Sequence, residues 1–218
     1  ASIVLPTVVQ VAAVLTESSP AGAVLLKLAA FGGLRIGECC GLQVGDIDPL
    51  RGVIRVRRQV QRTEDGEVEV TLPKYGSERD VYAPPELLAD LAAYVAEHRP
   101  GLNRERWIVV GEDGLRPWHQ NSAGHAWRQA CKRAGVLGVR FHDLRHFYAS
   151  GLIADGCDAV TVARSLGHRN TQQTYNRHAH LWPNAADRTR AAASGLMAGV
   201  TAAQDDGQKD STRTDRAL

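Results

Sequence analysis

The 218-residue sequence is poor in aromatic residues (6%), has a single methionine and lacks any long apolar run. No stretch approaches the roughly 18 apolar residues that a membrane-spanning helix needs, and the segment ASIVLPTVVQ lacks the basic start of a signal peptide. These absences argue against an integral membrane or secreted protein, and we expect a cytoplasmic one. With 44% hydrophobic residues, the chain can bury one sizeable core.

Cysteine is also scarce, and no pair has the CxxC spacing of a zinc or redox site. The four cysteines are Cys39, Cys40, Cys131 and Cys157. We therefore expect reduced thiols that serve as packing residues.

Charge is nearly balanced over the whole chain, with a formal net charge of +2, but it is unevenly distributed. Residues 121–180 contain eight Lys or Arg against three acidic residues, an excess of five positive charges. Such a block suits a polyanion such as nucleic acid. A solvated basic face would have the same composition, so charge alone does not decide between the two.

Hydrophobic patterning predicts a mainly α-helical fold with one small antiparallel β-sheet, an α+β class. A helix is expected after Thr7, and the segment 21–33 is apolar nearly all round, which marks a central buried helix. An Asp-Gly turn joins two alternating segments into a β-hairpin, and a third strand can follow. The strands are expected at 52–62, 68–73 and 78–84, and further helices at 34–42, 86–99, 121–134, 142–154, 158–166 and 171–180.

Five cationic or titratable residues occur at breaks or on one helix face. His142 and Arg145 are three residues apart in FHDLRHFYAS, so on a helix both project from the same side. Arg35 stands at a glycine-marked helix start, Lys74 in a turn between strands, and His168 after a glycine that ends a helix.

This set matches the needs of phosphodiester transfer. Negative charge accumulates on the non-bridging oxygens during attack at phosphorus, and arginine forks can hold those oxygens without a metal. A lysine can protonate the leaving 5′ oxygen, and histidines can move or orient protons near neutral pH.

Four motifs, in this order, resemble those of the tyrosine recombinases, the phage integrase family. They are FGGLRIGECCGLQVGDID, TLPKYGSERDVYAP, FHDLRHFYAS and SLGH, and the resemblance runs from about residue 6 to 190. The segment HLWPNAADRTRAA further resembles the C-terminal end of actinobacterial phage integrases. The resemblance implies a tyrosine recombinase catalytic-domain fold. It also implies DNA strand cleavage through a 3′-phosphotyrosyl intermediate, followed by rejoining, with no metal or other cofactor.

The same resemblance implies a role for each matching residue. Arg35 and Arg145 resemble the arginines that clamp the phosphate, and Glu38 resembles an acidic residue that supports the first arginine. Lys74 resembles the general acid, and His142 and His168 resemble the two histidines of the family.

The nucleophile position departs from the family pattern. The family tyrosine usually follows the second histidine by nine or ten residues, whereas Tyr175 follows His168 by seven and His178 by ten. Three hypotheses remain open. Tyr175 substitutes after a shift in helix register; His178 attacks directly; or the chain binds DNA without cleaving it.

Other chemistry is also possible at these residues. His142 and His146, four residues apart, could form half of a metal site in a metallohydrolase, although Arg145 between them would repel a cation. Arg35 could simply pair with Glu38 on its own helix, and Lys74 alone would be an ordinary turn lysine.

The resemblance also implies partners and a domain organisation. We expect residues 1–196 to form the catalytic domain and 197–218 a disordered tail, with an N-terminal core-binding domain outside this sequence. The partner is double-stranded DNA, near the nucleoid of a bacterial host. The protein would be a monomer without DNA and a homotetramer on it. A stripe of apolar residues after His180 could dock on a neighbouring protomer or on its own domain: Leu181, Ala185, Ala192 and Leu196.

Overall fold

The computed structural model describes residues 5–178, 189–190 and 193–199, and the side chains of 176–178 lie outside this description. The chain divides into two compact units, Ala1–Ala179 and His180–Leu218. Every helix and strand named below belongs to the first unit. In the second, residues 193–199 are helical, whereas 200–218 and three of the four apolar residues predicted to dock lie outside the described residues.

The first two helices begin at the residues that their caps dictate. Helix α1 spans Val8–Thr16, and the Thr7 hydroxyl accepts a hydrogen bond from the Gln10 amide while the Gln10 side chain accepts one from the Thr7 amide. Helix α2 spans Pro20–Gly32, with Ser19 as its cap and a proline in its first turn. The prediction that α2 is a central buried helix is confirmed, because most of its apolar side chains are buried.

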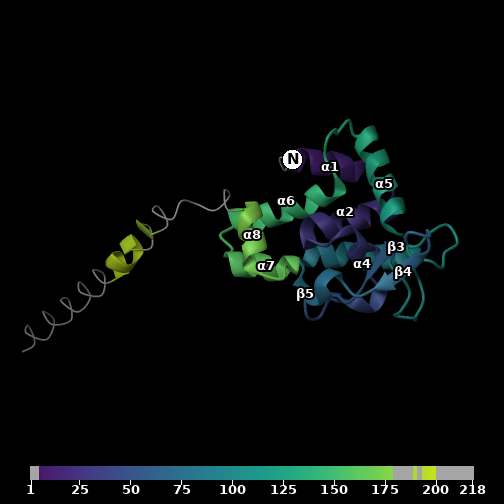
Figure 1. Ribbon diagram of the computed structural model, residues 1–218, viewed down its shortest axis with the longest axis horizontal. Coiled ribbons are helices and arrows are strands. Elements are labelled where there is room, and N and C mark those ends of the chain that lie inside the picture. Colours follow the sequence, from purple (N-terminus) through teal and green to yellow (C-terminus); the bar gives the residue numbers. More distant parts are fainter. Residues whose placement is uncertain (1–4, 179–188, 191–192, 200–218) are drawn as a thin grey trace, which may run out of the picture. The chain divides into compact units, whose positions relative to one another are not determined.

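Later helices pack around α2. Helix α6 (Phe141–Ala154) lies against it, α4 (Pro85–His98) contacts it on another side, and α5 (Gln120–Arg133) contacts both α1 and α2. Helix α3 (Ile36–Cys40) is short and follows α2 directly. Helices α7 (Ala159–Leu166) and α8 (Thr171–His178) lie side by side (Figure 1). Each predicted helix is present within a few residues of its expected bounds.

The strands form two small antiparallel sheets, where the sequence predicted one. Strands β1 (Ile47–Asp48), β2 (Val53–Val56) and β5 (Arg79–Tyr82) form the first, in the order β1-β2-β5. Strands β3 (Gln59–Arg62) and β4 (Val68–Thr71) form the second, which is the predicted hairpin. Two single 3₁₀ turns, Val44–Asp46 and Lys74–Gly76, precede β1 and β5. The predicted fold class is confirmed.

The predicted strand 52–62 is wrong as one continuous element, because it breaks between β2 and β3. At the break, Arg57 pairs with Asp80 of β5 and Arg58 pairs with Asp46. Arg58 also donates a hydrogen bond to the Gly41 carbonyl. These long-range partners lie on different parts of the fold, so local alternation alone could not predict the break.

Within the described residues, no helix combines the length and apolar character needed to cross a bilayer.

The core of the described residues is one apolar cluster. It includes Leu25 and Leu28 of α2, Ile54 of β2, Leu91 of α4 and Leu144 of α6.

A close contact at Gly33 predicts a large effect of adding one methyl group. Gly33 has φ +66°, and a Cβ there would lie 2.4 Å from Cδ1 of Tyr148. We expect Gly33→Ala to lower the free energy of unfolding by at least about 3 kcal/mol, since overpacking adds to the left-handed backbone cost. Urea denaturation measures the change.

Gly52 supplies the matched control, because its φ is +68° and a methyl group added there would meet no atom within 4 Å. Gly52→Ala should therefore cost only about 1 kcal/mol, the backbone contribution alone. Equal losses in the two variants would contradict the clash with Tyr148.

Candidate active site

Two arginines predicted to clamp a phosphate meet at the junction of α2, α6 and α7. Arg145, from the middle of α6, donates hydrogen bonds to the carbonyls of Gly33 and Leu166. Arg35, which caps α3, donates from Nη2 to the carbonyl of Gly167 at 3.2 Å. Because Leu166 and Gly167 are consecutive, the two guanidinium groups lie beside the same short segment, although 110 residues separate them in the sequence.

The buried carboxylate of Glu38 holds the first of these arginines in place. It accepts a hydrogen bond from Nη1 of Arg35 at 2.7 Å and another from the Arg35 amide at 2.9 Å. Arg79 of β5 donates to both of its oxygens, at 2.8 and 3.1 Å. Glu38 thus supports Arg35, in the position that the family resemblance implies for it.

Arg79 is a site residue that the sequence analysis missed. Besides Glu38, it donates to the carbonyl of Ser165, at the end of α7, from Nε at 3.0 Å. The signal that could have revealed it is strand alternation: residues 79 and 81 of β5 are buried, whereas 80 and 82 face outward. An arginine on the inward face of a strand requires a buried partner.

The electrostatics of this arginine cluster (Arg35, Arg79 and Arg145) favour an anion. Burial alone would raise the pKa of Glu38, but the hydrogen bond and charge of Arg79, with the charge of Arg35, lower it to about 2. Burial, and after it the charge of Arg35, lower the pKa of Arg145. With one carboxylate among three guanidinium groups, the cluster keeps a net positive charge.

His168 lies beside this cluster, immediately after Gly167. Gly167 ends α7 with φ +61°, and a Cβ there would approach Nη1 of Arg79 to 2.9 Å. The Nδ1 atom of His168 is 2.7 Å from the hydroxyl of Thr174, which is fully buried on α8. This hydrogen bond fixes the imidazole ring between α7 and α8.

The other predicted residues lie nearer the surface. His142 is exposed in the first turn of α6, and its ring is 4.9 Å from that of the buried His146, at a right angle. Lys74 is exposed in the 3₁₀ turn before β5, and Tyr175 is 51% exposed on α8. The structure thus brings Arg35, Arg145 and His168 together. The side chain of His178 lies outside the described residues.

A cavity of about 730 Å³ opens beside the arginine cluster. The turn before β5 and the end of α7 form its two sides, and its lining includes Tyr75, Ser77, Arg79, Arg164, His168 and Arg169. His168 thus belongs both to this cavity and to the predicted site, and the cavity carries further arginine side chains.

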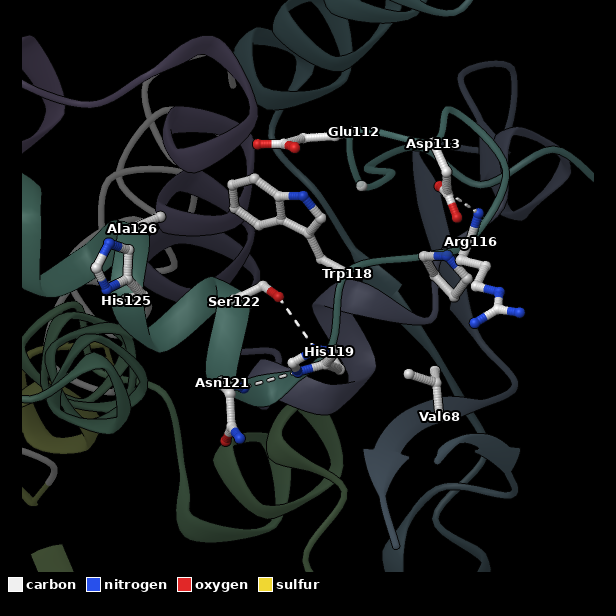
Figure 2. A pocket seen from close by; sticks show the side chains of 12 residues that line it. Val68, Glu112, Asp113, Arg116, Trp118, His119, Asn121, Ser122, His125 and Ala126 are labelled. Atoms are coloured by element: carbon white, nitrogen blue, oxygen red, sulfur yellow. Dashed lines mark hydrogen bonds between the residues drawn. The ribbon is translucent and has the colours of Figure 1, made fainter. Parts of the chain in front are cut away.

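A second cavity, of about 710 Å³, lies between the β3-β4 hairpin and the start of α5 (Figure 2). None of the predicted catalytic residues lines it. Its His119 caps α5, accepting a hydrogen bond at Nδ1 from the Asn121 amide at 3.2 Å. Burial, and then the charge of Arg62, lower the pKa of His119 and keep the ring able to accept. His119 therefore serves as the N-cap of α5.

In the part of the chain that the structure describes, the predicted metal pair of His142 and His146 has no third ligand. Among the described residues, no three His, Cys, Asp or Glu side chains are grouped so as to hold a metal ion. Cys39, Cys40 and Cys131 are free thiols and are buried as predicted. Burial raises the pKa of Cys40 to about 12, which suits a packing role.

Comparison with known proteins identifies the family. The family model "Phage integrase family" matches residues 8–184, and the chain therefore belongs to the phage integrase family. Among curated relatives, it is 30% identical over 161 residues to transposase A from transposon Tn554 of Staphylococcus aureus, covering 72% of this chain and 43% of that protein. It is 31% identical over 159 residues to the ICEBs1 integrase of Bacillus subtilis, covering 70% and 43%. The chain thus spans less than half the length of these relatives.

Solved structures support the same fold. The Tn1549 transposon integrase, solved in complex with a circular intermediate DNA, superposes with a TM-score of 0.73 at 21% identity, covering 89% of this chain and 66% of the other. The XerA recombinase superposes with a TM-score of 0.65 at 19% identity, covering 89% and 64%. The predicted tyrosine recombinase catalytic-domain fold is confirmed.

The low pKa of Glu38 predicts how stability depends on pH. Its carboxylate has a pKa of about 2 in the folded protein against an ordinary value of 4.5, which corresponds to stabilisation on the order of 3 kcal/mol. Because the folded pKa is lowered, this contribution is complete above about pH 4.5 and is lost as the pH falls toward about 2. Glu38→Gln should remove it, and urea denaturation at pH 7 and at pH 3 measures the loss.

An exposed carboxylate provides the control for the Glu38 substitution. Glu64 lies in the loop between β3 and β4, and Glu64→Gln should leave stability within about 0.5 kcal/mol at both pH values. If Glu38→Gln kept the full pH dependence of the unaltered protein, Glu38 would not be the ionised partner of Arg35 and Arg79.

Proposed function

We propose that this chain is the catalytic domain of a site-specific DNA recombinase that cuts and rejoins DNA strands without a metal. The observation that carries this proposal is the convergence of Arg35 and Arg145 on the consecutive carbonyls of Leu166 and Gly167, beside His168. Membership of the phage integrase family and the DNA complex of the Tn1549 transposon integrase also support it.

Each site residue has a defined role in this proposal. The hydroxyl or imidazole of a nucleophile attacks phosphorus, and a covalent bond to the 3′ phosphate forms as the bond to the 5′ oxygen breaks. Arg35 and Arg145 hold the non-bridging oxygens, where negative charge grows during attack. Lys74 gives its proton to the leaving 5′ oxygen, and His142 and His168 orient the phosphate and move the proton of the nucleophile. Attack by a second 5′ hydroxyl reverses these steps and rejoins the strand.

Helix α8 supplies the nucleophile, and two of its positions compete for the role. Tyr175 has the phenol that a phosphotyrosyl intermediate needs, but it is half exposed. Thr174 points toward His168, and a residue four positions later lies on the same face of a helix. That residue is His178, three positions beyond Tyr175, which corresponds to about 4.5 Å along the axis.

A second candidate function, which none of the comparisons supports, is a DNA-binding protein of this fold that does not cleave; the histidine at position 178 is the observation that raises it. An imidazole is shorter than a phenol, and a displacement of about 1 Å can cost on the order of a hundredfold in rate. Both candidates require phosphate-dominated DNA binding, and only the first requires a covalent adduct.

A nicked suicide substrate distinguishes the two functions. We expect His178→Tyr to give at least about tenfold more covalent protein-DNA adduct than the unaltered chain, because it places a phenol on the Thr174 face of α8. Gel electrophoresis quantifies the adduct, and peptide mapping locates it. If the unaltered chain already forms an adduct that Tyr175→Phe abolishes, Tyr175 is the nucleophile; if neither protein forms an adduct, the recombinase proposal is wrong.

DNA binding can be tested without cleavage. Arg169 is exposed and lines the cavity beside the arginine cluster, so Arg169→Ala should weaken binding and reduce the slope of log Kd against log salt by about 1. Fluorescence anisotropy with duplex DNA at several salt concentrations measures the slope. Arg51, which is exposed between β1 and β2 and is not among the residues that line the cavity, is the control, and Arg51→Ala should leave the slope unchanged. An unchanged slope for Arg169→Ala would remove this cavity from the DNA interface.

The assembly belongs to the same proposal. The chain would act as a monomer without DNA and as a homotetramer on it, since exchange joins two cleaved duplexes. A core-binding domain on the N-terminal side would complete a clamp around the duplex. In the second compact unit, Leu196 lies on the helical segment 193–199, and its apolar side chain would dock either on a neighbouring protomer or on its own domain.

A further inference from the structure

Tyr75 has an unfavourable backbone conformation at the edge of the cavity beside the arginine cluster. Among the described residues, it is the one non-glycine residue with positive φ, at +65°. Gly76 follows with φ +62°, so two successive residues adopt the left-handed conformation in the turn before β5. Residues with a Cβ rarely adopt this conformation, and asparagine or glycine would adopt it at a lower cost in backbone strain.

The Tyr75 ring contacts the ammonium group of Lys74. Nζ lies 5.2 Å from the ring centroid, within the range of a cation-π contact, and Tyr75 as a whole residue is 65% exposed. The same turn forms one side of the cavity that includes His168 and Arg79. The contact between Lys74 and Tyr75 therefore lies at the edge of this cavity, which Tyr75 lines.

Stability does not account for a tyrosine at this position. An exposed cation-π contact is weak, and the left-handed backbone of a residue with a Cβ costs at least as much as such a contact contributes. Strained residues that persist beside a site commonly serve its function.

We propose that Tyr75 is a positioning residue that holds the Lys74 ammonium over its ring, ready to protonate the 5′ oxygen when the phosphodiester breaks. This inference rests on the proposed function, in which Lys74 is the general acid. The turn carrying Lys74 is otherwise exposed, so the ring limits the directions in which the flexible lysine stem points. As the bond between phosphorus and the 5′ oxygen breaks, one ammonium proton passes to that oxygen, which leaves a 5′ hydroxyl and a neutral amine.

The contact itself can be measured without any cleavage. The sequence has four lysines, Lys27, Lys74, Lys132 and Lys209, so reductive ¹³C-methylation gives a simple NMR spectrum, and Lys74→Arg assigns the Lys74 signal. We expect an upfield ring-current shift for Lys74 that persists in Tyr75→Phe and disappears in Tyr75→Asn. Asparagine tolerates positive φ, so this variant removes the ring without adding backbone strain. A Lys74 signal that is the same in all three proteins would overturn the proposal.

Two DNA substrates test whether Tyr75 positions Lys74. The Tyr75 variants are made in the unaltered chain or in His178→Tyr, depending on which of the two forms the covalent protein-DNA adduct. With an ordinary phosphodiester, Tyr75→Asn should slow adduct formation by about tenfold or more, and Tyr75→Phe should restore the rate. With sulfur replacing the 5′ bridging oxygen, the leaving thiolate needs no proton, so the effect of Tyr75→Asn should shrink to less than about threefold. In a Lys74→Ala background, Tyr75→Asn should have no further effect.

The alternative outcomes are distinct. Equal slowing of both substrates would show that Tyr75 maintains structure only, and no slowing would show that Lys74 does not depend on it; either result overturns this inference and leaves the recombinase proposal standing. If neither background forms an adduct, the recombinase proposal fails, and the role of Tyr75 in it fails as well.

Discussion

The site depends on one buried ion, the carboxylate of Glu38. It is the acidic partner of two guanidinium groups from elements far apart in the sequence, Arg35 before α3 and Arg79 in β5. Arg79 in turn reaches the carbonyl at the end of α7. Without a negative charge at this point, the crowded guanidinium groups would repel one another and remain incompletely bonded in a buried space. Glu38 therefore allows a positively charged cluster to exist inside the fold.

For the proposed transfer at phosphorus, this balance gives the cluster two useful properties. The guanidinium groups are oriented in advance, so little reorganisation accompanies the growth of negative charge in the transition state. The cluster also keeps an excess of positive charge, because a single carboxylate does not neutralise Arg35, Arg79 and Arg145. The bonds of Arg145 to main-chain carbonyls contribute orientation without neutralising charge, since a carbonyl is only a dipole.

The sequence predicted those parts of the structure that depend on local chemistry. Thr7 and the apolar segment 21–33 predicted the first helices, because caps and burial patterns act over a few residues. The motifs located Arg35, Arg145 and His168, which the structure brings together. The role of Arg79 and the break between β2 and β3 were not predicted, because both depend on pairs such as Arg79 with Glu38 and Arg58 with Asp46 that only the folded chain brings together.

The position of the proposed nucleophile is limited by both a tertiary contact and the periodicity of α8. The hydrogen bond between His168 and Thr174 ties the start of α8 to the end of α7, and helical periodicity then fixes which later positions share the face of Thr174. By helical periodicity, position 178 shares that face and position 175 does not, so the proposed attack by Tyr175 would require α8 to turn or shift. Such a change would break the contact that orients His168, which itself belongs to the site. A nucleophile at position 175 would therefore require another hydrogen-bond partner to orient His168 in place of Thr174. A phenol at position 178 is compatible with the existing hydrogen bond between His168 and Thr174.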